Sequence, residues 1–434
     1  MDRSRKRNRV RRDARYGRQC YALPIVEIFT YMTIESGTTG TPEGSEAVNE
    51  AFWQGVRDAY PEQTPFLNLN NAAVSPPPRV VEEAAVEAYR FVSRNPDFNM
   101  WRRLDAGLPE VKARLAAMID CDAGEVALNR NSSEGLCTAI FGIPMSAGDE
   151  VLISDWDYPS VRASWMQRRS RDGIAVGTVT FDLNDSDDAI VDAYANAITP
   201  RTRVMQFTHM IHWMGRVLPI RQLCALAASR GIVTVVDGAQ TFAQMPVSFR
   251  ELGCDFFATS LHKWLGAPVG NGMLVVRRDR IEATWPLLGP FNDPRPDDIA
   301  KFEHWNLGTV NSALQAGILP AIRFHERIGT ARIHDRLRSL TRYWAAAAAG
   351  IPGFRMHTRL DVPAIGAVSL FSLDGVDAQQ VEARLHDDYG IHVKYRKVRN
   401  VEGLRVSPHI YMLERELDGF VQALSEIARD VRPS

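Results

Sequence analysis

The fold is decided by two stretches, Val235-Val236-Asp237-Gly238-Ala239-Gln240 and Thr259-Ser260-Leu261-His262-Lys263-Trp264. The first reads as a buried strand that ends in an acid, and the second carries a lysine beside a histidine shortly after another strand. They lie one strand–helix unit apart. Because ligands of a doubly wound sheet bind beyond the carboxyl ends of its strands, we expect Asp237 and Lys263 to lie at the same sheet edge.

Short β-branched runs alternate with helical patterns on both sides of these stretches. The predicted strands are Val126–Leu128, Val151–Ser154, Val176–Phe181, Val204–Thr208, Ile232–Val236, Phe256–Thr259 and Met273–Val276. Buried strands that alternate with helices are typical of parallel sheets covered on both faces. The sequence therefore predicts an α/β fold with a mostly parallel, seven-stranded sheet sandwiched by helices.

The regions on either side of this pattern differ from it and indicate further parts of the chain. Long helices are expected over residues 316–349, followed by short strands and a terminal helix from Glu414. We predict four parts: a basic, disordered tail and linker (1–45), an N-terminal segment that packs on the small domain (46–90), a large cofactor-binding domain (91–315), and a small α+β domain (316–434).

The bulk composition is that of an ordinary soluble globular protein. The 434 residues are 45% hydrophobic and 24% charged, and the net charge of −1 gives no overall attraction to nucleic acid. Five cysteines without paired spacing favour neither a disulfide framework nor a metal site, and they indicate a reducing, cytoplasmic location. No apolar run approaches the roughly 18–20 residues of a membrane span.

The first twenty residues are the exception, because eight Arg and one Lys stand there against two Asp. A solvated, disordered tail is the favoured interpretation. A targeting segment and a nucleic-acid contact stay open, although the apolar run that a secretory signal needs is interrupted by Glu27. Translation from Met32 would remove the basic block altogether.

Asp237 and Lys263 together suggest chemistry with pyridoxal phosphate (PLP). This cofactor needs an amine that holds its aldehyde as a Schiff base, and a carboxylate that keeps its pyridine nitrogen protonated. Burial and a neighbouring cation both help a lysine to lose its proton and react. A lone strand-terminal Asp is more often a cap or turn residue. In combination with Lys263 and Gln240, the cofactor role is favoured.

Donors for the cofactor phosphate are expected at the start of a helix. The segment Asn131-Ser132-Ser133-Glu134-Gly135-Leu136 follows the first strand and opens a helix, although an ordinary capping box explains the same residues equally well. Ser260 and His262 lie beside the lysine and add side-chain donors. Tyr158 follows another strand end and is placed to stack on the pyridine ring, although a core tyrosine is the commoner role.

In their order and spacing these segments resemble the class V aminotransferase family of fold-type I PLP enzymes. Within that family they resemble the isopenicillin-N-epimerase-like branch, which is related to the cysteine desulfurases. The resemblance covers about residues 65–425. It rests on Asn70–Pro76, Asn131–Leu136, Asp157–Tyr158, Asp237–Gln240, Ser260–Trp264, Gly308–Thr309 and Leu404–His409.

The resemblance implies a role for each candidate residue and a homodimer with sites at its interface. Arg405 would bind the substrate α-carboxylate, and a guanidinium suits this because it donates two parallel hydrogen bonds. The other implied roles are the Schiff base (Lys263), the pyridine nitrogen (Asp237), the ring hydroxyl (Gln240), ring stacking (Tyr158), the phosphate (Ser132, Ser133, Ser260, His262) and the phosphate of the partner subunit (Thr309). Asn71 and His212 are predicted as further substrate contacts.

Three features depart from the family pattern. No Cys follows Cys254, so the persulfide mechanism of the cysteine desulfurases is not expected. Thr208–Gly215 contains two His and a Trp, which indicate either an extra acid–base group or rings that pack against the sheet edge. The basic run Lys394–Arg399 lies close to Arg405; it either reads an acidic substrate or forms a solvated hairpin, and the hairpin is favoured.

We therefore predict a PLP-dependent enzyme that acts at Cα of an amino acid or peptide-like amine. Fold alone does not decide which bond is cleaved. An aminotransferase or epimerase is favoured over a C–S or β-elimination lyase. Epimerisation needs a second proton donor, for which His212 is the candidate. The alternative from another functional class is a non-catalytic protein with the PLP fold and a nucleic-acid-binding tail. The intact set of Lys263, Asp237, Gln240 and Arg405 argues against this alternative, because a protein without catalysis does not need all four residues.

Overall fold

The computed structural model describes residues 50–62, 65–289, 295–303, 306, 308–362, 364–399 and 401–430. The basic block, the linker and Met32 lie outside the described residues, so their predicted roles stay predictions.

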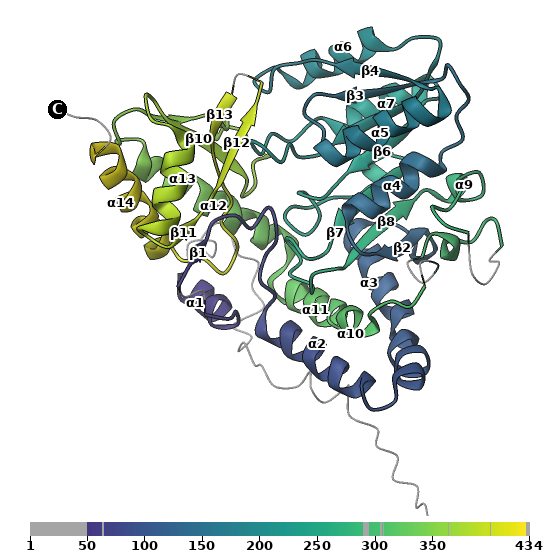
Figure 1. Ribbon diagram of the computed structural model, residues 1–434, viewed down its shortest axis with the longest axis horizontal. Coiled ribbons are helices and arrows are strands. Elements are labelled where there is room, and N and C mark those ends of the chain that lie inside the picture. Colours follow the sequence, from purple (N-terminus) through teal and green to yellow (C-terminus); the bar gives the residue numbers. More distant parts are fainter. Residues whose placement is uncertain are drawn as a thin grey trace, which may run out of the picture. The chain divides into compact units, whose positions relative to one another are not determined.

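A seven-stranded sheet forms the centre of the fold (Figure 1). Neighbouring strands pair in parallel from β4 to β7, whereas β8 is antiparallel to both β7 and β2. The predicted mostly parallel sheet and all of its strands are confirmed. In spatial order they are β2 (Val126–Asn129), β8 (Gly272–Val276), β7 (Phe256–Ser260), β6 (Val233–Asp237), β5 (Thr202–Thr208), β3 (Glu150–Ser154) and β4 (Ala175–Val179).

The predicted strand boundaries differ from the observed ones by one or two residues, and the predicted end of β4 is wrong: the strand ends at Val179, not at Phe181. The chain leaves the sheet there because the Phe181 carbonyl accepts hydrogen bonds from side chains, namely Trp156 Nε1 at 3.0 Å and Arg399 Nη1 at 3.2 Å. Phe181 itself is buried in the core.

Both faces of the sheet are covered, as the apolar strands require. Consecutive strand residues belong to different hydrophobic clusters: Val235 and Phe256 pack into one, and Val236 and Phe257 into the other. This alternation is what a strand with two buried faces produces. The covering helices in Figure 1 are α3 (Leu108–Ile119), α4 (Ser132–Gly142), α5 (Pro159–Asp172), α6 (Asp187–Ala197) and α7 (Ile220–Ser229).

A smaller, antiparallel sheet follows in the chain. Its order is β12 (Lys394–Val398), β13 (Val401–Val406), β10 (Ser369–Leu373) and β9 (Phe354–Met356), and the helices of this region are α12 (Thr330–Ala348), α13 (Ala378–Asp387) and α14 (Glu414–Asp430). The predicted terminal helix from Glu414 is confirmed. The helical pattern of residues 316–349 divides at Gly329, which has φ +89° and separates α11 (Ile318–Ile328) from α12.

The described N-terminal segment pairs with the end of the chain. Its elements are α1 (Glu50–Asp58), β1 (Leu67–Asn68) and α2 (Arg79–Val92). Strand β1 pairs in parallel with β11 (Ile391–His392), and Asn70 forms a β-bridge with Ser407. Both contacts join this segment to residues near the end of the chain, and the division into four parts stays a prediction.

Short elements complete the described chain. They are α8 (Phe249–Leu252), α9 (Arg278–Ile281), α10 (Ser312–Ala316), the π-helix η1 (Phe98–Leu104) and the 3₁₀ helices η2 (Asp105–Gly107), η3 (Ala123–Glu125) and η4 (Ile299–Phe302). None of the helices in the described ranges combines the length and the hydropathy that crossing a membrane requires.

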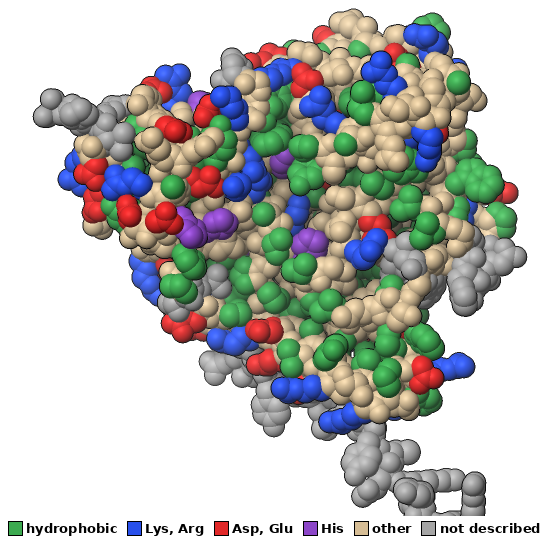
Figure 2. All heavy atoms as spheres, in the orientation of Figure 1, with side chains coloured by type: hydrophobic (Ala, Val, Ile, Leu, Met, Phe, Trp, Pro, Cys, Tyr) green, Lys and Arg blue, Asp and Glu red, His purple; other side chains and the backbone are tan. Residues whose placement is uncertain are grey.

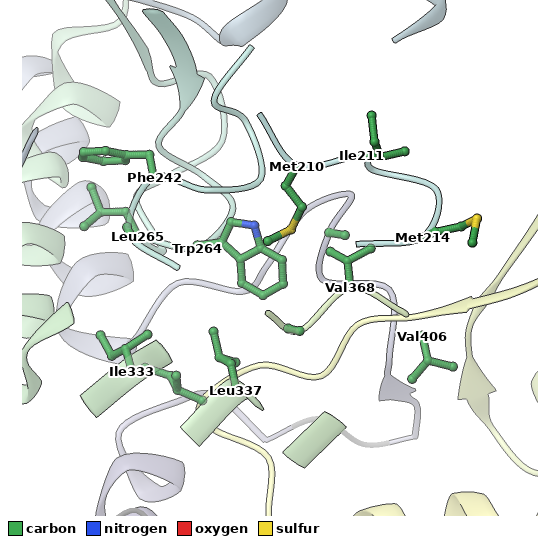
Figure 3. Packing of buried hydrophobic residues seen from close by; sticks show 14 of the residues in the cluster. Met210, Ile211, Met214, Phe242, Trp264, Leu265, Ile333, Leu337, Val368 and Val406 are labelled. Carbon is green, nitrogen blue, oxygen red and sulfur yellow. The ribbon is translucent and has the colours of Figure 1, made fainter. Parts of the chain in front are cut away.

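One apolar cluster joins the two sheet regions (Figure 3). Trp264 lies in it beside Met210 and Leu265, and Ile333 and Val368 from the C-terminal region pack into the same cluster. Because Trp264 directly follows Lys263 in the chain, this cluster also fixes the backbone that carries the lysine.

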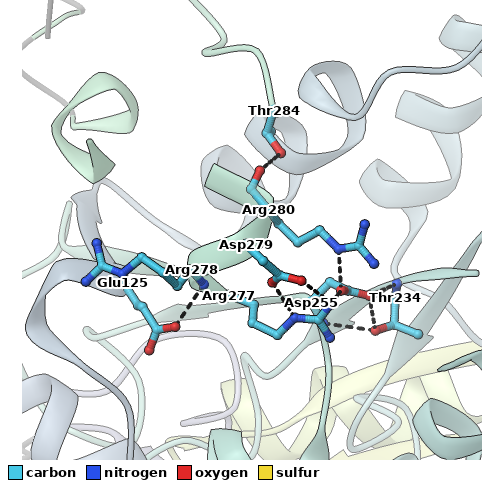
Figure 4. A network of polar contacts seen from close by, with 8 residues as sticks. All are labelled: Glu125, Thr234, Asp255, Arg277, Arg278, Asp279, Arg280 and Thr284. Atoms are coloured by element: carbon cyan, nitrogen blue, oxygen red, sulfur yellow. Dashed lines mark hydrogen bonds and ion pairs between the residues drawn. The ribbon is translucent and has the colours of Figure 1, made fainter. Parts of the chain in front are cut away.

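A polar network anchors the start of β7 (Figure 4). One carboxylate oxygen of Asp255 pairs with Arg277 and with Arg280, both at 2.7 Å. The other accepts hydrogen bonds from Thr234 N at 2.7 Å and Thr234 Oγ1 at 3.0 Å. Asp255 thus ties β6, β7 and α9 together.

We expect Asp255→Ala to destabilise the fold by about 2–3 kcal/mol, because it leaves the buried Thr234 N–H without its acceptor, removes the acid that pairs with Arg280, and removes one of the two acids that pair with Arg277. The loss of stability stays moderate because both arginines are about a third exposed, so water can solvate them. The matched control is Asp279→Ala, which removes an exposed partner of Arg277 and should cost less than about 1 kcal/mol. Urea unfolding followed by circular dichroism measures both, and equal losses would contradict the anchoring role.

Candidate active site

A pocket opens at the carboxyl ends of the central strands. On the face seen in Figure 2, Lys, Arg and His side chains gather near the middle of the molecule. The pocket is lined by the ends of β5 and β6, the segment after β7, the first turn of α4, and residues of β12 and β13. All predicted site residues line it except Asn71 and Thr309.

Asp237 and Lys263 are brought to this edge, as their places in the sequence predict. Asp237 is the last residue of β6, and its Oδ1 accepts a hydrogen bond from Ala239 N at 2.9 Å. Burial raises its pKa, while that hydrogen bond and Lys263 act in the opposite direction. Burial lowers the pKa of Lys263 to about 8, opposed by Asp237 and assisted by Arg405. A reactive neutral amine is therefore available close to neutral pH.

The first turn of α4 lines the pocket with Ser132 and Ser133. Its N-cap is Asn131, whose side chain accepts from Glu134 N at 2.9 Å, so the cap is not a serine. Ser260 Oγ accepts from Ser132 N at 2.9 Å and donates to Ser132 Oγ at 3.1 Å. His262 Nδ1 lies 3.1 Å from the Asn271 carbonyl. Hydroxyls, a histidine ring and the start of a helix thus meet in one corner of the pocket, which is the combination that the predicted phosphate contact requires.

Gln240 is held rigidly in the pocket wall. Its Nε2 donates to the Ala72 carbonyl and its Oε1 accepts from Trp264 Nε1, both at 3.0 Å. Its amide thus connects the N-terminal segment with the apolar cluster below the lysine.

The placement of Asn71 does not support the predicted substrate contact. Its side chain is fully buried and lies outside the pocket lining. Its Nδ2 donates to the carbonyls of Asn68 and Ser407, and its Oδ1 accepts from the Tyr411 hydroxyl. Asn71 therefore attaches the N-terminal segment to the C-terminal region. Its neighbour Asn70 contacts Arg405, although it too lies outside the pocket lining.

Arg405 is a buried cation with neutral partners. It is 2% exposed and donates to the His212 carbonyl at 3.1 Å and to Asn70 Oδ1 at 2.6 Å. Its Nε has no hydrogen-bond partner within the described part of the chain. Burial and the nearby Arg396 lower its pKa to about 9, so it remains charged at neutral pH. A buried charge of this kind is costly unless an anion binds to it.

The two histidines of the loop after β5 have different surroundings. His212 lines the pocket, and its ring meets Tyr158 edge-on with the ring centroids 4.9 Å apart. Its buried Nδ1 lacks a partner in the described structure. Burial, then Arg405 and Lys263, hold its pKa well below the ordinary value. His209 instead contacts Thr241 in the core and does not line the pocket.

Ten lining residues were not among the predicted site residues: Ala72, Ala73, Arg130, Asn131, Thr208, Met210, Ala239, Val269, Gly270 and Arg396. Arg396 belongs to the basic run for which a solvated hairpin was favoured, and for this residue that interpretation is wrong. Thr309 is exposed and away from the pocket of its own chain. The described cysteines are all free, and none of them lines the pocket.

Comparison with known sequences places the chain in a family. The model of the family described as aminotransferase class-V matches residues 67–423. Isopenicillin N epimerase of Amycolatopsis lactamdurans is 29% identical over 395 residues, with 87% of this chain and 99% of the relative covered. Cysteine desulfurase of Klebsiella pneumoniae subsp. pneumoniae is 27% identical over 345 residues, covering 76% of this chain and 83% of the relative.

Solved structures share the fold. The Escherichia coli cysteine desulfurase CsdA superposes with a TM-score of 0.77 at 24% identity, covering 88% of this chain and 99% of that one. The cystine C–S lyase C-DES, in complex with its product cysteine persulfide, gives 0.77 at 21% identity and covers 85% and 99%. The expected fold-type I architecture is therefore confirmed, and the chain belongs to the class V aminotransferase family.

Proposed function

We propose that the protein is a PLP-dependent enzyme that removes the α-proton of an amino acid and returns a proton to the opposite face, as an epimerase does. The observation that carries the proposal is the buried Lys263, with its pKa at about 8, in one pocket with Asp237 and the first turn of α4. The relatives named isopenicillin N epimerase support the choice of reaction.

The residues of the pocket fit this cofactor. Lys263 would supply the amine for its aldehyde, and Asp237 the carboxylate for its pyridine nitrogen. Ser132, Ser133, Ser260 and His262 would hold its phosphate, Gln240 would contact its ring hydroxyl, and Tyr158 would stack on its ring. When bound, PLP supplies an electron sink for the charge left on Cα.

The remaining steps belong to side chains of the chain itself. Arg405 binds the α-carboxylate through its fork of N–H groups and so orients the Cα–H bond. Lys263, once its amine is free, takes the proton from one face of Cα.

His212 is the group proposed for the other face. It is neutral because burial, and then the charges of Arg405 and Lys263, hold its pKa well below the ordinary value. A bound substrate carboxylate offsets the charge of Arg405 and thereby raises the pKa of His212, which makes the ring a better proton carrier.

Transamination and elimination begin with the same removal of the α-proton as epimerisation. The three reactions are distinguished by their products. Ammonia together with a 2-oxo acid would identify a lyase, and a 2-oxo acid without ammonia an aminotransferase. A lyase reaction that passes sulfur to an enzyme cysteine is disfavoured, because none of the described cysteines lines the pocket.

The proposal includes a cytoplasmic homodimer. Thr309 is exposed and outside its own pocket, which is the placement that a contact with the partner's phosphate requires. The free state of the described cysteines supports a reducing compartment.

Addition of PLP should give the parent protein a visible absorption band, and Lys263→Ala should lack it entirely, because the variant has no amine to bind the aldehyde. Lys397→Ala is the matched control: this lysine is exposed on β12 and pairs with Glu402. An absorbance spectrum of each protein after removal of free PLP makes the comparison. A band that persists in Lys263→Ala would refute the assignment.

The rate of PLP attachment to the apoprotein should rise with pH and level off above the Lys263 pKa of about 8. Only the neutral amine reacts with the aldehyde, so the rate rises as Lys263 loses its proton. Burial lowers the pKa of Lys263, which moves this rise to a lower pH than for an ordinary lysine. Stopped-flow absorbance over a pH series measures this rate. A rate that keeps rising towards pH of about 10, where an ordinary lysine titrates, would show that Lys263 is not desolvated.

For an amino acid that the enzyme inverts, His212→Gln should lose inversion by about 10²–10⁴-fold, the usual contribution of a general acid or base. Exchange of the α-hydrogen with solvent deuterium should continue for the enantiomer that Lys263 serves. Proton NMR in D₂O and chiral chromatography follow the two processes. His386→Gln, on the surface, is the control. Equal loss of exchange and inversion would remove His212 from the proposed role.

A further inference from the structure

Most of the basic residues around the β12–β13 hairpin are neutralised by nearby acids. Lys394 pairs with Glu382 at 3.1 Å, and Lys397 with Glu402 at 2.8 Å. Arg399 pairs with Asp155 across the molecule. These three side chains therefore form ordinary surface ion pairs, and none of them needs a ligand to balance its charge.

Arg396 is different from its neighbours. It lines the pocket and is partly buried, and no acid pairs with it among the described residues. Its Nη1 donates to the Tyr395 carbonyl at 3.2 Å, and its buried Nε has no hydrogen-bond partner there. The guanidinium lies over the Trp213 ring, 5.5 Å from its centroid, so the indole holds it in place without neutralising it.

The register of the hairpin places Arg396 next to Arg405. Arg396 pairs with Gly403 and Lys394 pairs with Arg405, so the two arginines are diagonal neighbours on one face of the sheet. The Cα atoms of such neighbours are about 7–8 Å apart. Arg130, another cation in the lining, already pairs with Glu134 at 3.0 Å. Arg396 and Arg405 are therefore two adjacent cations that lack acidic partners in the described structure.

We propose that the pocket is built for an amino acid with two anionic groups: Arg405 takes the α-carboxylate, and Arg396 takes a second carboxylate or another oxyanion at the far end of the substrate. This inference rests on the proposed function and adds the substrate class to it. Two adjacent cations in a pocket are offset by a ligand that presents two anions, each held by charge-assisted hydrogen bonds.

Calorimetric titration of the holoenzyme with glutarate and with butyrate tests the second anion site without turnover. Glutarate should bind about tenfold or more tightly than butyrate. Arg396→Gln should weaken glutarate binding by about tenfold or more and change butyrate binding by less than about threefold. Lys397→Gln, one residue further along the strand and on its other face, should change neither. Equal affinity for the two acids, or equal weakening of both, would overturn the proposal.

A second titration identifies which anionic group Arg396 prefers. Replacing glutarate by 4-phosphonobutyrate, which has the same three methylenes, compares a phosphonate with a carboxylate at the same end, and either preference supports the site provided that it disappears in Arg396→Gln. Failure of the proposed function is seen separately as the absence of the Lys263-dependent band. A normal band together with no preference for dianions would refute this inference alone.

Discussion

The site depends on how closely the turn after β6 packs against β7. A Cβ atom on Gly238 would lie 1.8 Å from a ring atom of Phe257, so only glycine allows the approach. Gly238 N donates to the Ala258 carbonyl at 2.9 Å, and Thr259 Oγ1 donates to the Gly238 carbonyl at 3.2 Å. These contacts hold the acid at the end of β6 beside the strand that leads to the lysine. Without them the two groups would not share one pocket.

The pocket combines this rigid edge with an unfavourable charge balance. Lys263, Arg405 and Arg396 are cations near one another, and Asp237 is the acid that faces the lysine. Neighbouring cations repel one another and so lower the free energy of unfolding of the ligand-free protein. The apolar cluster around Trp264 holds the backbone of Lys263 in place despite this repulsion. Anionic ligands offset the cost, so binding and folding are thermodynamically linked at this site.

Much of the fold could be predicted because its signals are local. Apolar runs of strand length alternate with helices, and Asp237 and Lys263 follow strand ends that parallel pairing brings together. The direction of a side chain is harder to predict. Asn70 and Asn71 carry the same amide, and only packing decides that Asn70 contacts Arg405 while Asn71 is buried away from the pocket. Arg396 could not be separated from its basic neighbours because Glu382, Glu402 and Asp155, which neutralise them, are scattered along the chain.

The pairing of β1 with β11 has a consequence for how the site is assembled. Leu67 and Ile391 are neighbours in space but more than 300 residues apart in the chain. The Asn70–Ser407 bridge has a similar separation, and Ala72 of the pocket wall follows directly. Contacts of such long range form late and slowly in folding. During synthesis the N-terminal segment must therefore wait for the last hairpin, and the pocket is complete only after nearly the whole chain has been made.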